Sequence, residues 1–271
     1  MFVSIATTHR PATDLGFLLM KHPERVHEVD LNFGKGVLLY PEAHESRCEA
    51  VLMIDVDPVG LVRGRGTSDG LLDQYVNDRP YAATSFLSVA LNRALRTAMT
   101  GVSRERPELA ASLLPLELRV TPLPARGGEA LVRSLFEPLG WKVSLERIEG
   151  PNGASRYVDL KLIGEMRVAD ALAHLYVLIP VLDDDKHYWV GDDDVEKLLA
   201  RGGAWLASHP QKELIAKRYL KNRGALTRAA LARLAPEAAE EESEQAEPRL
   251  TSEEAIERPI RLNDLRIEAV L

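Results

Sequence analysis

The pattern of apolar and polar residues predicts short strands at the start of the chain and helices at its end. Residues 2–7 alternate as a strand does, and residues 11–20 have helical spacing that Pro23 stops. Between residues 80 and 100 apolar side chains recur at helical spacing until Gly101 ends the run. Further strands are predicted at 26–33, 37–40 and 50–56.

The predicted elements in the second half of the chain follow a recognisable order. A strand at 116–120, a helix at 128–139, strands at 141–148 and 157–163 and a helix at 168–179 are predicted in turn. This order is most of a ferredoxin-like unit, whose last strand would be the short segment 187–190. The C-terminal helices are predicted at 192–200, 205–207, 213–220 and 227–234.

These patterns predict an α+β fold in several parts. A mixed α/β subdomain at 1–114 is followed by a ferredoxin-like βαββα unit and a helical segment at 115–235. Segment 236–258 reads as an acidic disordered linker, since it lacks apolar periodicity. Residues 259–271 then read as the start of a further domain that this chain lacks.

Charge and composition change this picture little. The formal net charge is −7, but nine glutamates and one arginine at 237–257 supply −8, so the body is nearly neutral. The single cysteine, Cys48, excludes an internal disulfide and reads as a packed thiol. No leader and no apolar run of membrane-spanning length is found, so we expect a cytoplasmic protein that does not contact membranes.

The most unusual stretch has two aspartate triplets around a basic and aromatic patch. The second triplet, 192–194, precedes a helix and is expected to cap it. Metal binding is the weaker interpretation, because the spacing differs from that of a calcium loop. We predict that the remaining residues anchor a protein partner, although a small hydrophobic plug under the loop fits His187, Tyr188 and Trp189 equally well. The predicted partner-binding residues are Asp183, Asp184, Asp185, Lys186, His187, Tyr188 and Trp189.

The other motifs carry weaker signals. Residues 60–70 contain four glycines but neither a P-loop nor a dinucleotide-binding spacing, and a flexible connection is the favoured interpretation. Within it Arg63 and Arg65 are possible contacts for RNA phosphates. Residues 44–48 miss the zinc-protease signature, because Cys48 stands where its second histidine is needed. No catalytic residue and no metal ligand is therefore assigned.

Five runs of residues are distinctive: 8–16, 55–64, 75–81, 135–140 and 174–189. Together they resemble the N-terminal region of bacterial Hen-type RNA 3′-terminal ribose 2′-O-methyltransferases. The resemblance covers most of residues 1–235, and the runs are long and in family order.

The resemblance implies a binding and activating role for this half. In that family a methyltransferase domain follows the linker, binds S-adenosylmethionine and holds a divalent metal near the ribose. Neither feature is found in this chain, so we expect it to hold no cofactor and to catalyse nothing itself. The family resemblance further implies that this half associates with the bacterial polynucleotide kinase-phosphatase-ligase as a hetero-oligomer, activates its RNA ligase, and meets RNA only indirectly.

Two other hypotheses stay open. The chain could be an RNA-binding domain that presents RNA 3′ ends to the methyltransferase domain, although a nearly neutral body argues against strong phosphate binding. It could also be a metallohydrolase that uses the aspartate triplets. Salt-dependent RNA affinity without a partner would favour the first, and metal-dependent turnover of RNA ends the second.

Overall fold

Seven antiparallel strands join into one sheet in the order β2-β3-β4-β1-β5-β7-β6. The computed structural model describes residues 1–57, 84–150, 153–183, 192–221 and 223–234. The strands are β1 (Phe2–Thr7), β2 (His27–Leu31), β3 (Gly34–Ala43), β4 (Cys48–Val56), β5 (Leu114–Pro124), β6 (Lys142–Gly150) and β7 (Gly153–Met166).

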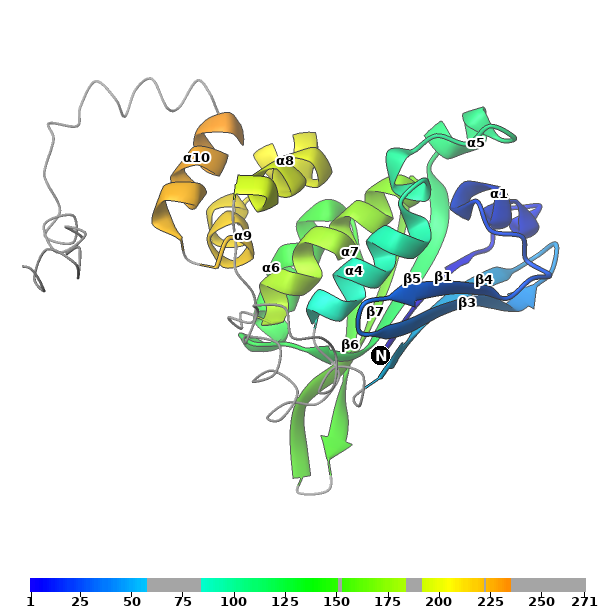
Figure 1. The fold of residues 1–271 in the computed structure, drawn as a ribbon, viewed down its shortest axis with the longest axis horizontal. Coiled ribbons are helices and arrows are strands. Elements are labelled where there is room, and N and C mark those ends of the chain that lie inside the picture. The colour runs from blue at the N-terminus through cyan, green and yellow to red at the C-terminus, as the bar shows by residue number, and fades with distance from the viewer. Residues whose placement is uncertain (58–83, 151–152, 184–191, 222, 235–271) are drawn as a thin grey trace, which may run out of the picture. The chain divides into compact units, whose positions relative to one another are not determined.

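Helices follow the strands along the chain and dominate its C-terminal part (Figure 1). The α-helices are α1 (Leu15–Leu19), α4 (Thr84–Leu95), α5 (Pro107–Ala111), α6 (Gly128–Phe136), α7 (Val168–Asp183), α8 (Asp192–Ala207), α9 (Lys212–Tyr219) and α10 (Gly224–Leu234). Short 3-10 turns are η1 (Ala12–Asp14), η2 (Ala98–Thr100) and η3 (Glu137–Leu139). The predicted α+β class is confirmed.

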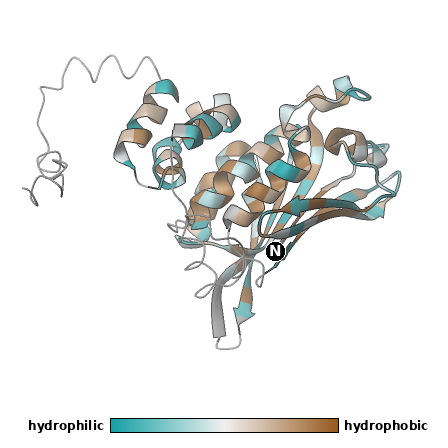
Figure 2. Ribbon diagram, in the orientation of Figure 1, coloured by the Kyte–Doolittle hydropathy of each residue, from teal (hydrophilic) through white to brown (hydrophobic). Residues whose placement is uncertain are grey.

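One face of the sheet carries the core. Alternate residues of its central strands are buried there, as Leu52, Leu118 and Leu160 show. Helices α4, α6 and α7 pack against this face, and Figure 2 shows brown, hydrophobic segments in them. Helix α7 is apolar on nearly all sides because it lies between the sheet and the C-terminal helices α8 and α9.

No helix among the described residues packs against the opposite face, which we call the open face. Its centre is apolar on β1, β3 and β4, and its charged residues lie around that centre. The register assigns it nine carboxylates: Glu28, Asp30, Glu42, Glu49, Asp55, Glu117, Glu146, Asp159 and Glu165. Five cationic groups accompany them: Lys35, Arg47, Arg119, Lys142 and Lys161.

The ferredoxin-like order of elements is present at β5-α6-β6-β7-α7, as predicted. Its strands lie side by side as β5-β7-β6, the arrangement of the first three strands of that fold. The expected last strand, 187–190, lies outside the described residues. Strand β1 takes the place beside β5 where such a strand would lie, with Thr7 opposite Leu116. The sheet thus runs across the predicted boundary between 114 and 115, and the division into subdomains stays a prediction.

Several element boundaries differ from the prediction, and three differences at the helices are informative. Helix α7 continues through Pro180 to Asp183, four residues past the predicted end, although proline removes a backbone hydrogen bond. The carbonyls of Val181 and Leu182 accept from donors on other elements, which stabilises this last turn. Helix α5 was not predicted, although Pro107 at its first turn is a common start signal. Helix α8 spans both predicted pieces, 192–200 and 205–207, with non-helical angles at Gly203.

Candidate partner-binding site at the end of helix α7

The last residue of α7, Asp183, accepts hydrogen bonds from the first residue of α4, Thr84. Oδ2 of Asp183 accepts hydrogen bonds from Oγ1 of Thr84 at 2.9 Å and from its backbone N–H at 3.4 Å. Both residues are buried, and the side chain of Asp183 caps the N-terminal end of α4. A carboxylate is stabilised there by the helix dipole and by the free N–H groups of the first turn.

The carbonyls at the end of α7 have donors from two other elements. The backbone N–H of Arg126, in the β5–α6 connection, donates to the carbonyl oxygen of Leu182 at 2.9 Å. Nη1 of Arg218, on α9, donates to the carbonyl oxygens of Val181 at 3.3 Å and Arg126 at 3.1 Å. A cation is favourable at a helix C-terminus. The end of α7 is therefore held by α4, the β5–α6 connection and α9 together.

Of the two stretches in which site residues were predicted, only the one that begins at Asp183 has a described residue at this junction. Asp183 is the one predicted partner-binding residue that the structure describes; Asp184, Asp185, Lys186, His187, Tyr188 and Trp189 lie outside the described residues, as do Arg63 and Arg65. Residue 184 follows Asp183 directly, and residue 83 precedes Thr84 directly. The Asp183–Thr84 hydrogen bond therefore fixes the end of α7 to the start of α4, a pairing for which the sequence has no local signal.

A row of aromatic and imidazole rings, buried except for the half-buried Trp205, packs α8 and the start of α9 against α7. Nε1 of Trp141 donates to Nδ1 of His174 at 3.1 Å, and the His174 ring meets Trp205 edge-on with centroids 4.9 Å apart. Trp205 lies beside His209, whose Nδ1 accepts the backbone N–H of Gln211 at 2.9 Å. The positive φ of Gly203 turns the chain just before Trp205. The sequence gives no sign of this row, because its members lie on separate elements.

Both histidines in this row are neutral. His174 accepts at Nδ1, so its proton is on Nε2, and burial lowers its pKa to about 4. His209 accepts at Nδ1 and donates from Nε2 to the carbonyl oxygen of Leu135 at 3.0 Å. Burial also lowers the pKa of His209. Both imidazoles thus contribute hydrogen bonds to the packing of these elements.

The second aspartate triplet opens α8, as predicted. The helix begins at Asp192, and Asp194 pairs with Lys197 through Nζ at 2.9 Å. Within the described ranges no three histidine, cysteine, aspartate or glutamate side chains come together as a metal site would need. Cys48 is buried, and burial raises the pKa of its thiol to about 11, in agreement with a packed thiol.

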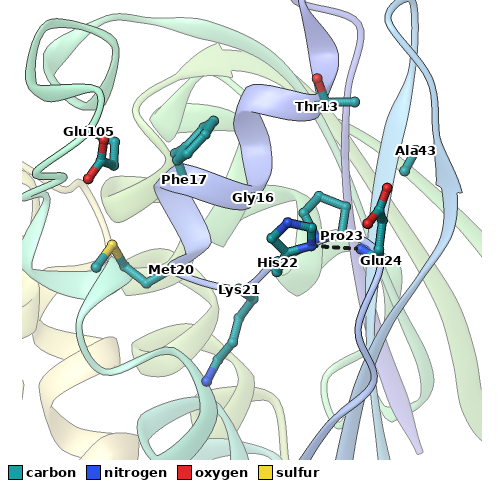
Figure 3. Close-up of a pocket in the computed structure, with 10 residues that line it drawn as sticks. All are labelled: Thr13, Gly16, Phe17, Met20, Lys21, His22, Pro23, Glu24, Ala43 and Glu105. Atoms are coloured by element: carbon teal, nitrogen blue, oxygen red, sulfur yellow. Dashed lines mark hydrogen bonds between the residues drawn. The ribbon is translucent and has the colours of Figure 1, made fainter.

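A cavity of about 440 Å³ lies beside α1 (Figure 3). Its wall is mostly apolar, and Phe17 and Met20 in it are about two-fifths exposed. The guanidinium of Arg106 stacks over the Phe17 ring at 4.7 Å and pairs with Asp14 at 3.0 Å. The cavity can receive an apolar side chain, and it was not predicted. Its full lining is Thr13, Gly16, Phe17, Met20, Lys21, His22, Pro23, Glu24, Ala43 and Glu105.

None of the helices in the described part of the chain is long and apolar enough to cross a bilayer.

Comparisons with known proteins identify the family. No curated protein sequence matches the chain. Two solved structures match it in fold with a TM-score of 0.53 and 16% identity; they are described as "Structure of the Pnkp1/Rnl/Hen1 RNA repair complex" and "Structure of Pnkp1/Rnl/Hen1 complex". The matches cover 90% and 91% of this chain but only 57% and 56% of those chains. The family described as "RNA repair, ligase-Pnkp-associating, region of Hen1" matches residues 1–235, and the chain therefore belongs to that family.

Proposed function

We propose that this chain is a non-catalytic module that binds a bacterial polynucleotide kinase-phosphatase-ligase in the cytoplasm and activates its RNA ligase. The observation that carries the proposal is the match of residues 1–235 to a region described as associating with that ligase. The solved neighbours, described as complexes that contain Hen1, support an assembly of the same kind. RNA would then reach the chain only through its partner.

The binding residues we propose are Asp184 to Trp189, whereas Asp183, also predicted to bind, is buried against Thr84 and acts as their attachment point. Asp183 is held by Thr84, and the two carbonyls before it are held by Arg126 and Arg218. An anchored attachment point lowers the entropy that a binding segment loses on association. Large aromatic residues such as Tyr188 and Trp189 dominate the energy of many interfaces. Activation would follow if the module contacts the competent ligase conformation more strongly than the incompetent one.

We further propose that neither S-adenosylmethionine nor a divalent metal takes part in this binding. In the family resemblance both belong to a methyltransferase domain that follows the linker. Binding measured in the presence of a chelator, and with S-adenosylmethionine added or omitted, should give the same dissociation constant. A metal-dependent or S-adenosylmethionine-dependent constant would contradict this part of the proposal.

The direct test mixes the purified chain with the partner enzyme. A stable complex is expected in size-exclusion chromatography with light scattering, together with a higher rate of ligase self-adenylylation from labelled ATP. If the mixture forms no complex, the proposed function is wrong. If a complex forms and the adenylylation rate is unchanged, binding stands and activation fails.

The site is tested by truncating its two aromatic side chains. Tyr188→Ala with Trp189→Ala should weaken the complex by about tenfold or more, since such residues are frequent hot spots. Val102→Ala is the matched control, because Val102 is an exposed apolar residue outside the sheet and outside this site. Equal affinity of the two variants, with intact circular dichroism spectra, would reject these residues as the binding site.

A further inference from the structure

The open face has an apolar centre of five side chains. Met53 on β4 lies opposite Val37 on β3 and Phe2 on β1, and Val51 lies opposite Leu39. Met53 is 44% exposed, the most of these five, and the others are half-buried. Apolar residues on an ordinary protein surface are scattered singly, whereas these five adjoin one another on the exposed side of an antiparallel sheet.

Carboxylates lie at both ends of this patch. Glu42, Glu49 and Glu117 lie at one end, and Asp55 lies at the other, directly after Met53 on the same face. Arg47 reaches the first three at 3.0, 3.8 and 3.5 Å, so one guanidinium is shared by three carboxylates. Lys161 adds a second cation to Glu117 at 3.2 Å. Among the described residues of the open face, nine carboxylates meet five cations, a formal charge of −4.

This combination argues for one kind of occupant. Protein interfaces have an apolar core and a polar rim, and complementary charge on the two rims speeds and orients association. A negative rim repels RNA phosphates, and Arg119, the cation nearest Phe2, already forms a two-pronged pair with Asp159. A bilayer with anionic lipids is disfavoured for the same reason.

We propose that the open face is a docking surface for a protein that presents an apolar patch rimmed with lysine and arginine. The inference rests on the proposed function, because it assigns this second surface to the same ligase-bearing partner. Two separate contacts, the end of α7 and the open face, would restrict the orientation of the partner more than either alone.

The test uses two exposed open-face residues and the full chain. Met53→Asp should weaken binding of the purified partner enzyme by about tenfold, because it buries an unpaired charge in the apolar contact. Asp55→Lys should weaken binding by several-fold and reduce its dependence on salt, since it removes one rim attraction. Val102→Asp is the matched control, as Val102 is exposed and lies outside the sheet.

Isothermal titration at two salt concentrations distinguishes the outcomes. The docking surface is supported if both open-face variants bind the partner more weakly while Val102→Asp binds it as the wild type does. Wild-type affinity in both variants overturns it and leaves the proposed function intact. If the wild type does not bind the partner at all, both the docking surface and the proposed function are overturned. If the wild type binds single-stranded RNA without the partner, and Met53→Asp weakens that binding, the docking surface is overturned in favour of an RNA-binding surface.

Discussion

Nε1 of Trp141 donates a hydrogen bond to Nδ1 of His174 at 3.1 Å in the buried layer between α7 and the C-terminal helices. This bond needs a free lone pair on Nδ1, so His174 must be neutral to keep it. Trp205 covers the same imidazole from α8. A charge on the His174 ring would therefore disturb its contacts with both Trp141 and Trp205, each more than thirty residues away in the sequence.

The free energy of unfolding should decrease as the pH is lowered, because of His174. Burial lowers its folded-state pKa to about 4, whereas the unfolded chain has the ordinary value near 6.5. Above pH 6.5 both states are neutral and the stabilisation is complete. As the pH falls from 6.5 towards 4 only the unfolded state takes up the proton, so the free energy of unfolding decreases, by about 2 kcal/mol between pH 8 and pH 5. Urea unfolding of the full chain measures this.

His174→Asn is the matched control for the pH effect. Oδ1 of asparagine can accept from Trp141 much as Nδ1 does, but it does not titrate. The variant should lose most of the pH dependence between 6.5 and 5, with a smaller remainder from His209, whose pKa burial also lowers. An equally steep decline in both proteins would assign the effect to other groups.

The pair formed by Asp183 and Thr84 should couple the ends of α7 and α4. A double-mutant cycle with Asp183→Ala and Thr84→Ala is expected to give a coupling free energy of about 1 to 2 kcal/mol, typical of a buried hydrogen bond to a charged acceptor. Denaturant unfolding of the four proteins provides it. Glu105→Ala with Thr84→Ala is a control pair whose effects should add. A coupling near zero for Asp183 and Thr84 would mean that their hydrogen bond adds no stability.

The local elements were largely predictable, and the long-range pairings were not. β1 begins and ends at the predicted residues, and α8 begins at Asp192 as expected, because alternation and capping are local signals. The alignment of β1 with β5 joins strands more than one hundred residues apart, which no local pattern encodes. The same holds for the site: Asp183 stood out by its charge, but its contact with Thr84 depends on how α4 and α7 pack.

Cys48 should react slowly in the native chain. It is buried at the start of β4, and burial, with a smaller contribution from Glu42, raises its thiol pKa to about 11. The thiolate fraction at pH 8 is then about a hundredfold below that of an ordinary cysteine, before any steric protection. Labelling with an aromatic disulfide reagent should be at least that much slower in the native than in the guanidinium-denatured chain. Rates within tenfold would show that β4 opens readily at this end.

A side chain at Gly34 should be strongly destabilising because it would collide with the neighbouring strand. Gly128 is the comparison, since a side chain there would add backbone strain without a collision. Both have positive φ, +146° and +73°, but a Cβ on Gly34 would lie 2.1 Å from the carbonyl oxygen of Asp55, whereas nothing lies within 4 Å of one on Gly128. Gly128→Ala should thus cost about 1 kcal/mol, the strain of a left-handed residue. Gly34→Ala must also push β3 away from β4, and we expect it to cost about 3 kcal/mol or more in urea unfolding.

The greater cost of Gly34→Ala has a second source in the core. Phe33, just before Gly34, stacks on Phe86 with ring centroids 4.3 Å apart, and its carbonyl oxygen accepts the N–H of Asp57 at 2.9 Å. Displacing β3 would move Phe33 away from α4 and break this backbone hydrogen bond. A difference of less than 1 kcal/mol between the two alanine variants would show that the β3–β4 pair shifts freely, and that Phe33 contributes little to holding α4 on the sheet.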